Sequence, residues 1–542
     1  MSSRAILAGA LCAVALFPSR GVSQEHDHRH EQLGRVVFPV SCSDEAQRRF
    51  ERAMTVLHSF WWEEGEGAFR AVLAADSTCA MAYWGIAMNA WNNPFAGGPS
   101  GAPLAAGAAA ATRATALGAR TPREQGFIAA VGALYRDHAT TSNAGRLQAY
   151  ADTMARLHRD IPGDLEVSIY YALSLVATAP RTDTTFARQK QAAVVLNPLF
   201  AQHPDHPGLA HYIIHANDSP YLAHLGLDAA RRYASIAPTA PHAQHMPSHI
   251  FVRLGLWDET IASNWKSYEA GVRYAAAQGS KTVAPHEFHA LDYAVYGYLQ
   301  QGRDSAARAV VRLADSITTD RVVSTLVGGY NRTALEARIP LERGEWRAAA
   351  AFPLRTAPGQ PLVEALSRFT RGIGAARSGN SAAARVETQG LAALEKGLAE
   401  RDPYWARVLG IKRQAVEAWI ALADGDTTGA IALARTAADT EEVTDKSPVT
   451  PGELLPAREL QADLLLAVGR YAEARQAYQA TLRREPGRAR STFGQARAAE
   501  LTGDRAGAVE GYRAYLALVE GGDGQRPEVA AARKAVAALE RS

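Results

Sequence analysis

Apolar residues recur every three to four positions along most of this chain, and alternating runs of β-branched residues are nearly absent. The clearest unit lies near the C-terminus, where an apolar stretch leads to a turn at Gly469 and then to an Ala-rich stretch that ends before Pro486. A second copy of this turn begins at Gly503, 34 residues later. The pattern predicts helical hairpins whose small residues let the two helices pack closely.

Looser copies of this turn occur through the rest of the chain, with a glycine followed five residues later by a small residue. The copies are Gly255/Thr260, Gly302/Ala307, Gly344/Ala349, Gly379/Ala384 and Gly425/Ala430. A weaker copy spans Trp62 to Asp76. The glycine spacings run from 34 to 47, so several connections must be longer than the minimal one. We expect an all-α solenoid in which Gly97 to Ala109 and Thr178 to Thr185 are loops.

The C-terminal unit resembles the tetratricopeptide repeat. From Gly469, an Ala follows five residues on, a Tyr nine on and a Pro seventeen on, in the order of that family's pattern. The resemblance implies hairpins stacked into a right-handed superhelix with a concave groove. Such grooves commonly bind a peptide or a protein, which makes binding the default function.

Histidines crowd the middle of the chain. Of 16 histidines, ten lie between His203 and His289. His211 and His215 are four residues apart, as are His245 and His249, so each pair shares one face of a helix. The two pairs are 34 residues apart, which is the repeat period, so they should lie side by side on neighbouring hairpins and face the groove. This arrangement predicts a metal site with the candidate ligands His206, His211, His215, His242, His245, His249, His286, His289 and Asp292.

Nitrogen ligands with few carboxylates favour Zn, Cu, Ni or Fe, as one ion or two. Asp218, Glu287 and Asp292 are candidates for ligands, for acceptors of ring N–H groups or for a general base, and Tyr296 could orient a substrate. Pro247 lies between His245 and His249 and would kink a helix there. A groove without metal, which binds polar or anionic groups, is the alternative.

The remaining histidines carry a weaker signal. We interpret His58, His138, His158 and His224 as hydrogen-bonding surface residues. The N-terminal His26, His28 and His30 are typical of a solvated leader, which can bind metal weakly.

Four segments are similar to those of a group of exported bacterial tetratricopeptide proteins. They are Cys79 to Met88, Thr121 to Gln125, His206 to His215 and His242 to Trp257. The match spans about Cys42 to Gln301. It implies the fold and export, and it assigns no catalytic residue.

The N-terminus predicts export. Arg4 precedes an apolar run from Ala5 to Phe17, which is too short to span a bilayer and is typical of a cleaved signal peptide. The mature chain keeps Cys42 and Cys79, an even pair for which we expect a disulfide, with two buried free thiols as the alternative. The expected segments are a signal peptide (1–23), a flexible histidine-containing segment (24–41), N-terminal repeats (42–200), histidine-rich repeats (201–320) and C-terminal repeats (321–542).

Composition and missing motifs narrow the function. The net charge of +3, without a Lys/Arg block, disfavours nucleic acid as a partner. A phosphate loop, a Gly-x-Ser-x-Gly elbow, a haem attachment motif and a His-Glu-x-x-His zinc helix are all absent. Three hypotheses remain. They are a scaffold whose histidines hold metal, a metalloenzyme that acts on a small molecule at the same cluster, and a metal-free peptide-binding repeat protein.

Overall fold

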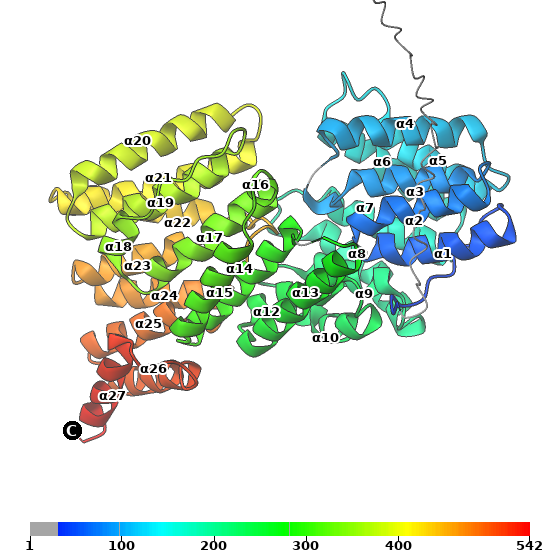
Figure 1. Cartoon of the computed structure of the whole chain (residues 1–542). Coiled ribbons are helices and arrows are strands. Elements are labelled where there is room, and N and C mark those ends of the chain that lie inside the picture. Colours follow the sequence, from blue (N-terminus) through cyan, green and yellow to red (C-terminus); the bar gives the residue numbers. More distant parts are fainter. Residues whose placement is uncertain (1–30, 97, 281, 542) are drawn as a thin grey trace, which may run out of the picture.

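The computed structural model describes residues 31–541 apart from residues 97 and 281, and within this part the chain is all-α (Figure 1). The first eight helices are α1 (Asp44–His58), α2 (Trp62–Ala75), α3 (Ala80–Trp91), α4 (Gly101–Leu117), α5 (Pro122–Tyr135), α6 (Asn143–Asp160), α7 (Leu165–Ala177) and α8 (Ala187–Gln202). A short 3-10 helix, η2 (Pro94–Ala96), lies between α3 and α4.

The middle of the chain carries the histidine-rich hairpins. Its helices are α9 (Pro207–Asn217), η3 (Ala223–Gly226), α10 (Leu227–Ile236), α11 (Pro241–His245), α12 (Pro247–Leu254), α13 (Trp257–Ala277), α14 (Pro285–Gln300) and α15 (Asp304–Ile317). The next helices are α16 (Asp320–Val323), α17 (Leu326–Glu342), α18 (Trp346–Ala350), α19 (Pro361–Arg377) and α20 (Ser381–Leu398). The C-terminal helices are α21 (Pro403–Ala423), α22 (Thr427–Glu442), α23 (Ala457–Ala467), α24 (Tyr471–Arg484), α25 (Ala489–Leu501), α26 (Arg505–Leu518) and α27 (Pro527–Leu539).

Consecutive helices pack as hairpins, which confirms the expected all-α solenoid of stacked helical pairs. The predicted turn glycines all adopt the left-handed conformation, with φ between +63° and +90°. They are Gly255, Gly302, Gly344, Gly379, Gly425, Gly469 and Gly503. This conformation ends one helix and reverses the chain, and residues with a side chain adopt it at a cost. The right-handed superhelix and the concave groove stay predictions.

Local sequence explains where helices begin. The hydroxyl of Thr121 accepts the backbone N–H of Glu124, and the Glu124 carboxylate accepts the N–H of Thr121, so the start of α5 is a capping box with Pro122 in the first turn. The same carboxylate also accepts the backbone N–H of Ser41 at 2.7 Å. Glu124 therefore caps the start of α5 and also hydrogen-bonds the N-terminal segment to that helix.

Two local expectations were wrong. The stretch expected to be a loop from Gly97 to Ala109 lies largely in α4, because its many alanines favour a helix once the chain leaves the turn. In the segment expected to be flexible, Leu33, Val36 and Phe38 are buried in the first core. The loop expected over Thr178 to Thr185 is confirmed, since it joins α7 to α8.

The largest hydrophobic core runs from Leu33 to Phe251 without a break at residue 200. The N-terminal helices and the histidine-rich hairpins therefore share one core. The signal peptide and His26, His28 and His30 lie outside the described residues. None of the described helices combines the length and the hydrophobicity that a membrane span needs.

The C-terminal repeats fold back onto the middle hairpins, and Figure 1 shows α25 and α26 (orange to red) beneath α15 (green). The indole N–H of Trp257 donates to the carbonyl of Gly487 at 3.0 Å. Arg526 forms a buried ion pair with Asp304. The connection between α22 and α23 also reaches the middle hairpins, where the hydroxyl of Tyr293 donates to the carbonyl of Thr450 at 3.3 Å.

Cys42 and Cys79 form a disulfide, as expected, with their Cα atoms 5.3 Å apart. The bridge joins the segment before α1 to the start of α3, so it closes a loop around the first hairpin.

Replacing both cysteines by serine should lower the free energy of unfolding by about 3–4 kcal/mol, because the bridge restricts a loop with a sequence separation of 37. Urea unfolding followed by tryptophan fluorescence measures this change. The single variants serve as controls and should lose as much stability as the double variant. Two reactive thiols in the unreduced mature protein would contradict the bridge.

Candidate metal centre

Six histidines gather into two adjoining groups of three in the middle of the chain. Within each group, one ligand nitrogen from each ring lies within 4.8 Å of the others. The first group is His211, His215 and His242, and the second is His245, His249 and His289. The groups touch, since the rings of His215 and His249 are 6.2 Å apart and those of His242 and His245 are 6.1 Å apart.

Helix periodicity places the ligand atoms. His211 and His215 stand one turn apart on α9, with their Nε2 atoms 3.1 Å apart. His245 and His249 are separated by Pro247, where α11 ends and α12 begins, but Met246 keeps helical dihedral angles (φ −52°, ψ −36°). Their Nε2 atoms are therefore still 3.0 Å apart. Both separations are close to the edge of a tetrahedron around an ion with bonds of 2.0–2.1 Å, which is about 3.3 Å.

The outer nitrogens of four rings face hydrogen-bond acceptors. Each of these contacts holds a ring by Nδ1 and directs its Nε2 inward, which is how proteins orient metal-binding imidazoles. The contacts are His211 Nδ1 to the carbonyl of His58 (2.6 Å), His245 Nδ1 to Asn264 Oδ1 (2.6 Å), His249 Nδ1 to Asp218 Oδ2 (2.8 Å) and His289 Nδ1 to Asn331 Oδ1 (3.5 Å).

These acceptors fix the tautomers of His245 and His249. The amide of Asn264 donates through Nδ2 to the carbonyl of Thr260 at 2.7 Å, so its Oδ1 must be the atom that accepts from His245. The carboxylate of Asp218 can only accept, so His249 also carries its proton on Nδ1. Two unprotonated Nε2 atoms then face each other at 3.0 Å. Two lone pairs cannot hydrogen-bond to each other, and a cation between them would satisfy both.

Burial keeps the six rings neutral. Loss of solvation lowers the pKa of His249 and lowers the pKa of the other five well below the ordinary value. A proton shared by two rings is therefore disfavoured, while neutral imidazole is the form that binds metal. The Nε2 atom of His242 is buried and has no hydrogen-bond partner among the described residues.

Aromatic rings enclose the first group. Phe60 lies 4.3 Å from His211, centroid to centroid, and Phe95 lies 4.0 Å from His215. Tyr233 stacks on His211 at 5.2 Å. These apolar walls exclude water and hold the rings in place. We expected these histidines to face the groove. In the structure they are buried or half-buried, and Lys446 of the α22–α23 connection lies 3.8 Å from Asp218 beside them.

Asp218 joins the second group to a set of cations. Its carboxylate accepts from Arg253 at 2.9 Å, and Lys446 lies 3.8 Å away. Burial raises the pKa of this carboxyl, but Lys446, Arg253 and His249 outweigh burial and hold it well below the usual value. Asp218 is therefore ionised and accepts the Nδ1 proton of His249 in a hydrogen bond, which leaves the Nε2 atom of that ring unprotonated.

His206, another expected ligand, belongs to a different group. His206 is buried and contacts Glu166 at 2.9 Å, and His58 contacts the same carboxylate at 3.0 Å. These three side chains are close enough to hold an ion. His58 was expected at the surface, but it is fully buried, because the last turn of α1 packs it against Tyr212 of α9.

His286 lies 3.4 Å from Glu63 and 3.4 Å from Glu287. Burial favours its neutral form, but the two carboxylates outweigh burial and raise the pKa of His286 to about 10. An imidazolium has no lone pair for a metal. Glu287 is buried beside it and lies outside both histidine groups.

Asp292 and Tyr296 lie elsewhere on α14. Asp292 forms a fully buried ion pair with Arg338 at 2.6 Å, so its carboxylate is not free for a metal. Tyr296 donates to Glu485 at 3.0 Å and accepts from Arg488 at 2.9 Å. On α14 the tyrosine that contacts the cluster is Tyr293, whose hydroxyl is 3.5 Å from His249.

Sequence reasoning missed Asn264, Asn331 and Tyr293, although it named Asp218. Asn264 follows Ile261 by three residues on the buried face of α13, and a polar residue at such a position is a signal for a buried partner. Asn331 lies in the same way on the buried face of α17. The backbone carbonyl of His58, which accepts from His211, could not be identified from the sequence, because every residue has a backbone carbonyl.

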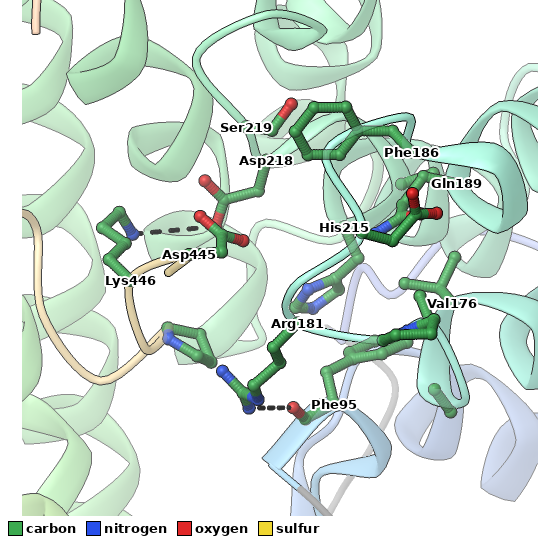
Figure 2. Close-up of a pocket in the computed structure, with 16 residues that line it drawn as sticks. Phe95, Val176, Arg181, Phe186, Gln189, His215, Asp218, Ser219, Asp445 and Lys446 are labelled. Carbon is green, nitrogen blue, oxygen red and sulfur yellow. Dashed lines mark hydrogen bonds and ion pairs between the residues drawn. The ribbon is translucent and has the colours of Figure 1, made fainter. Parts of the chain in front are cut away.

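A cavity of about 190 Å³ reaches the edge of the centre (Figure 2). Its wall includes His215 from the first group and Asp218, the acceptor for His249.

No protein-family model and no curated protein matches the sequence. Among solved structures, the chain is similar to Naa15/Naa10 bound to HypK-THB, with 11% identity and a TM-score of 0.24 over 91% of this chain and 74% of that chain. It is also similar to yeast Tom70 (11%, TM-score 0.26, 92% of this chain and 96% of that one) and to the P58(IPK) TPR domain (12%, 0.21, 85% and 98%). Likenesses this low carry no functional argument, and the fold follows from the packed hairpins above.

Replacing Asp292 by Asn should lower the free energy of unfolding by about 3–5 kcal/mol, because the buried Arg338 would lose its countercharge. Any metal bound by the histidines should be retained. Urea unfolding and elemental analysis of the same sample measure the two quantities.

The matched control is Asp315→Asn, which breaks the more exposed pair with Arg332 and should cost less than about 1 kcal/mol. Loss of metal from a folded Asp292→Asn protein would show that Asp292 acts at the centre after all.

Proposed function

We propose that this protein is a helical repeat protein that binds two transition-metal ions in adjoining three-histidine sites. The observation that carries the proposal is the pair of facing Nε2 atoms of His245 and His249, both unprotonated and 3.0 Å apart. The first group supports it, because His211 is held by Nδ1 in the same way.

The ligand set limits the metal. Six neutral nitrogens without a thiolate suit Zn, Cu, Fe or Ni and suit Mg or Ca poorly. The ligands come from α9, α11, α12 and α14, which belong to three successive hairpins. An ion in each group therefore ties neighbouring hairpins together, as a scaffold with structural metal requires.

A metalloenzyme is the second candidate function. Three protein ligands leave a coordination position free at each ion, as in catalytic rather than structural zinc sites. The cavity beside His215 gives a small molecule a place next to the centre. Bound metal would supply Lewis acidity or an activated water, and Tyr293 holds a hydroxyl 3.5 Å from His249.

The proposal includes export of the protein and a peptide or protein partner. The Cys42–Cys79 bridge is typical of oxidising compartments and supports export. Repeat arrays commonly bind peptides on their exposed faces, so we include a peptide or protein partner outside the covered centre.

The experiment that tests the function is elemental analysis of mature, untagged protein with single variants of each group. Wild-type protein should hold two equivalents of metal, and His242→Gln and His289→Gln should each lose about one, because each removes a half-buried ligand from one group. His224→Ala removes an exposed histidine and should change nothing. Circular dichroism confirms that each variant is folded.

The outcomes separate the hypotheses. Protein that holds no metal after incubation with Cu, Zn, Fe and Ni would overturn the proposal and favour a metal-free peptide-binding repeat. Azide that binds at the metal without unfolding the protein would favour the enzyme over the scaffold.

Replacing Asn264 by Leu should weaken metal binding in the second group by about 10- to 100-fold, because His245 loses the acceptor that orients it. Competition with a chromophoric chelator measures the affinity. Ser267→Ala is the matched control, since it removes a buried hydrogen bond from the same helix to the carbonyl of Pro241 without touching a ring. Equal affinities in the two variants would argue against an orienting role.

A further inference from the structure

The cavity beside the metal centre is built from segments that are far apart in the sequence. Phe95 contributes from η2, Arg181 and Phe186 from the α7–α8 loop, His215 from α9 and Lys446 from the α22–α23 connection. Figure 2 shows these side chains around one space. A volume of about 190 Å³ is slightly larger than a cavity known to hold benzene, so it suits one small ring or a short chain.

The cavity offers a cation without a countercharge. The guanidinium of Arg181 donates to the carbonyl of Phe95 at 3.0 Å and lies over the ring of Tyr404 at 4.6 Å. Three carboxylates also line the cavity, and none forms an ion pair with Arg181: Asp218 and Asp445 pair with Arg253, and Asp183 accepts hydrogen bonds from Thr185 and from the backbone of Ala187. Arg181 is therefore free to bind an anion, and its planar fork matches a carboxylate.

Two further features of the wall point to a ligand. The Oε1 atom of Gln189 is buried and has no hydrogen-bond partner among the described residues. An ionised carboxylate cannot donate to this oxygen, but a half-turn of the amide puts Nε2 in its place, and Nε2 donates to a carboxylate oxygen. Phe186 has φ +54°, a conformation that residues with side chains adopt rarely and that concentrates at binding sites. Its ring and that of Phe95 make part of the wall apolar.

The proposed metal centre adds an electrostatic reason for an anion. Six neutral imidazoles would leave the full charge of two ions in this site. Among the described residues, Asp218 is the one carboxylate hydrogen-bonded to any of the six rings, and it already pairs with Arg253. An anion in the adjoining cavity lowers the cost of this charge, because attraction is strong where water is excluded.

We propose that the cavity binds a small carboxylate with a single apolar ring, its charge on Arg181 and its ring between Phe95 and Phe186, next to the metal centre. The inference rests on the proposed function for the position of the metal. It names the class of molecule that this site would accept.

Calorimetric titration of the metal-loaded protein with benzoate tests the proposal. Arg181→Gln should weaken benzoate binding at least tenfold and leave the binding of neutral benzamide nearly unchanged. Ala179→Phe should fill the cavity and abolish the binding of both, while metal content stays the same. Arg159→Gln, which removes an exposed arginine far from the cavity wall, is the control and should bind benzoate like the wild type.

Two comparisons complete the test. Benzoate should bind more tightly to metal-loaded than to metal-free protein, and inorganic phosphate, which lacks an apolar part, should bind more weakly than benzoate. Benzoate affinity that is the same in wild type, Arg181→Gln and Ala179→Phe would overturn the inference while metal binding stands. Metal absent from every sample would overturn the proposed function, and benzoate binding lost in Ala179→Phe would then support a carboxylate pocket without metal.

Discussion

The contact between two imidazole nitrogens inside the protein core is the constraint on which the central part of the structure depends. His245 and His249 both commit their Nδ1 protons to acceptors, so their Nε2 lone pairs meet at 3.0 Å. Such a contact is repulsive unless a positive charge lies between the atoms. Burial keeps that charge from being a proton, because it lowers the pKa of both rings. The surrounding helices are arranged to support this contact, with α13 supplying Asn264 and the end of α9 supplying Asp218.

The covering of the centre is the second organising feature. In a simple solenoid each repeat touches only its neighbours. Here the α22–α23 connection and the C-terminal hairpins return to the middle of the chain through buried polar contacts. Arg338 shows how this is done, since it pairs with Asp292 and also donates to Thr450 at 2.9 Å and to the carbonyl of Gly452 at 3.0 Å. These contacts contribute to the complete burial of Asp292, one of the expected ligands.

Sequence alone predicted what depends on local periodicity. The four-residue spacing within the two histidine pairs and the 34-residue step between them placed the rings on adjacent helices, and the turn glycines marked the hairpins. It could not predict contacts between distant segments. Asp292 has the right spacing for a ligand, but Arg338 on α17 takes its carboxylate, and Glu63 on α2 helps to turn His286 into a cation. Residue spacing within one helix does not indicate which side chain of another hairpin will form an ion pair with a given residue.

The fold-back contacts also bear on the order in which the chain folds. Contacts within the histidine hairpins are local, whereas the hydrogen bond of Trp257 to Gly487 spans 230 residues and that of Arg253 to Asp445 spans 192. Contacts that close long loops form late in folding, because the chain loses conformational entropy on closing the loop before the contact contributes any stabilisation. We therefore expect the six rings to come together while their cover is still open. In that interval the proposed ions would reach the ligands from solvent, and closure of the cover would then slow their release. The metal would therefore bind during folding rather than after it.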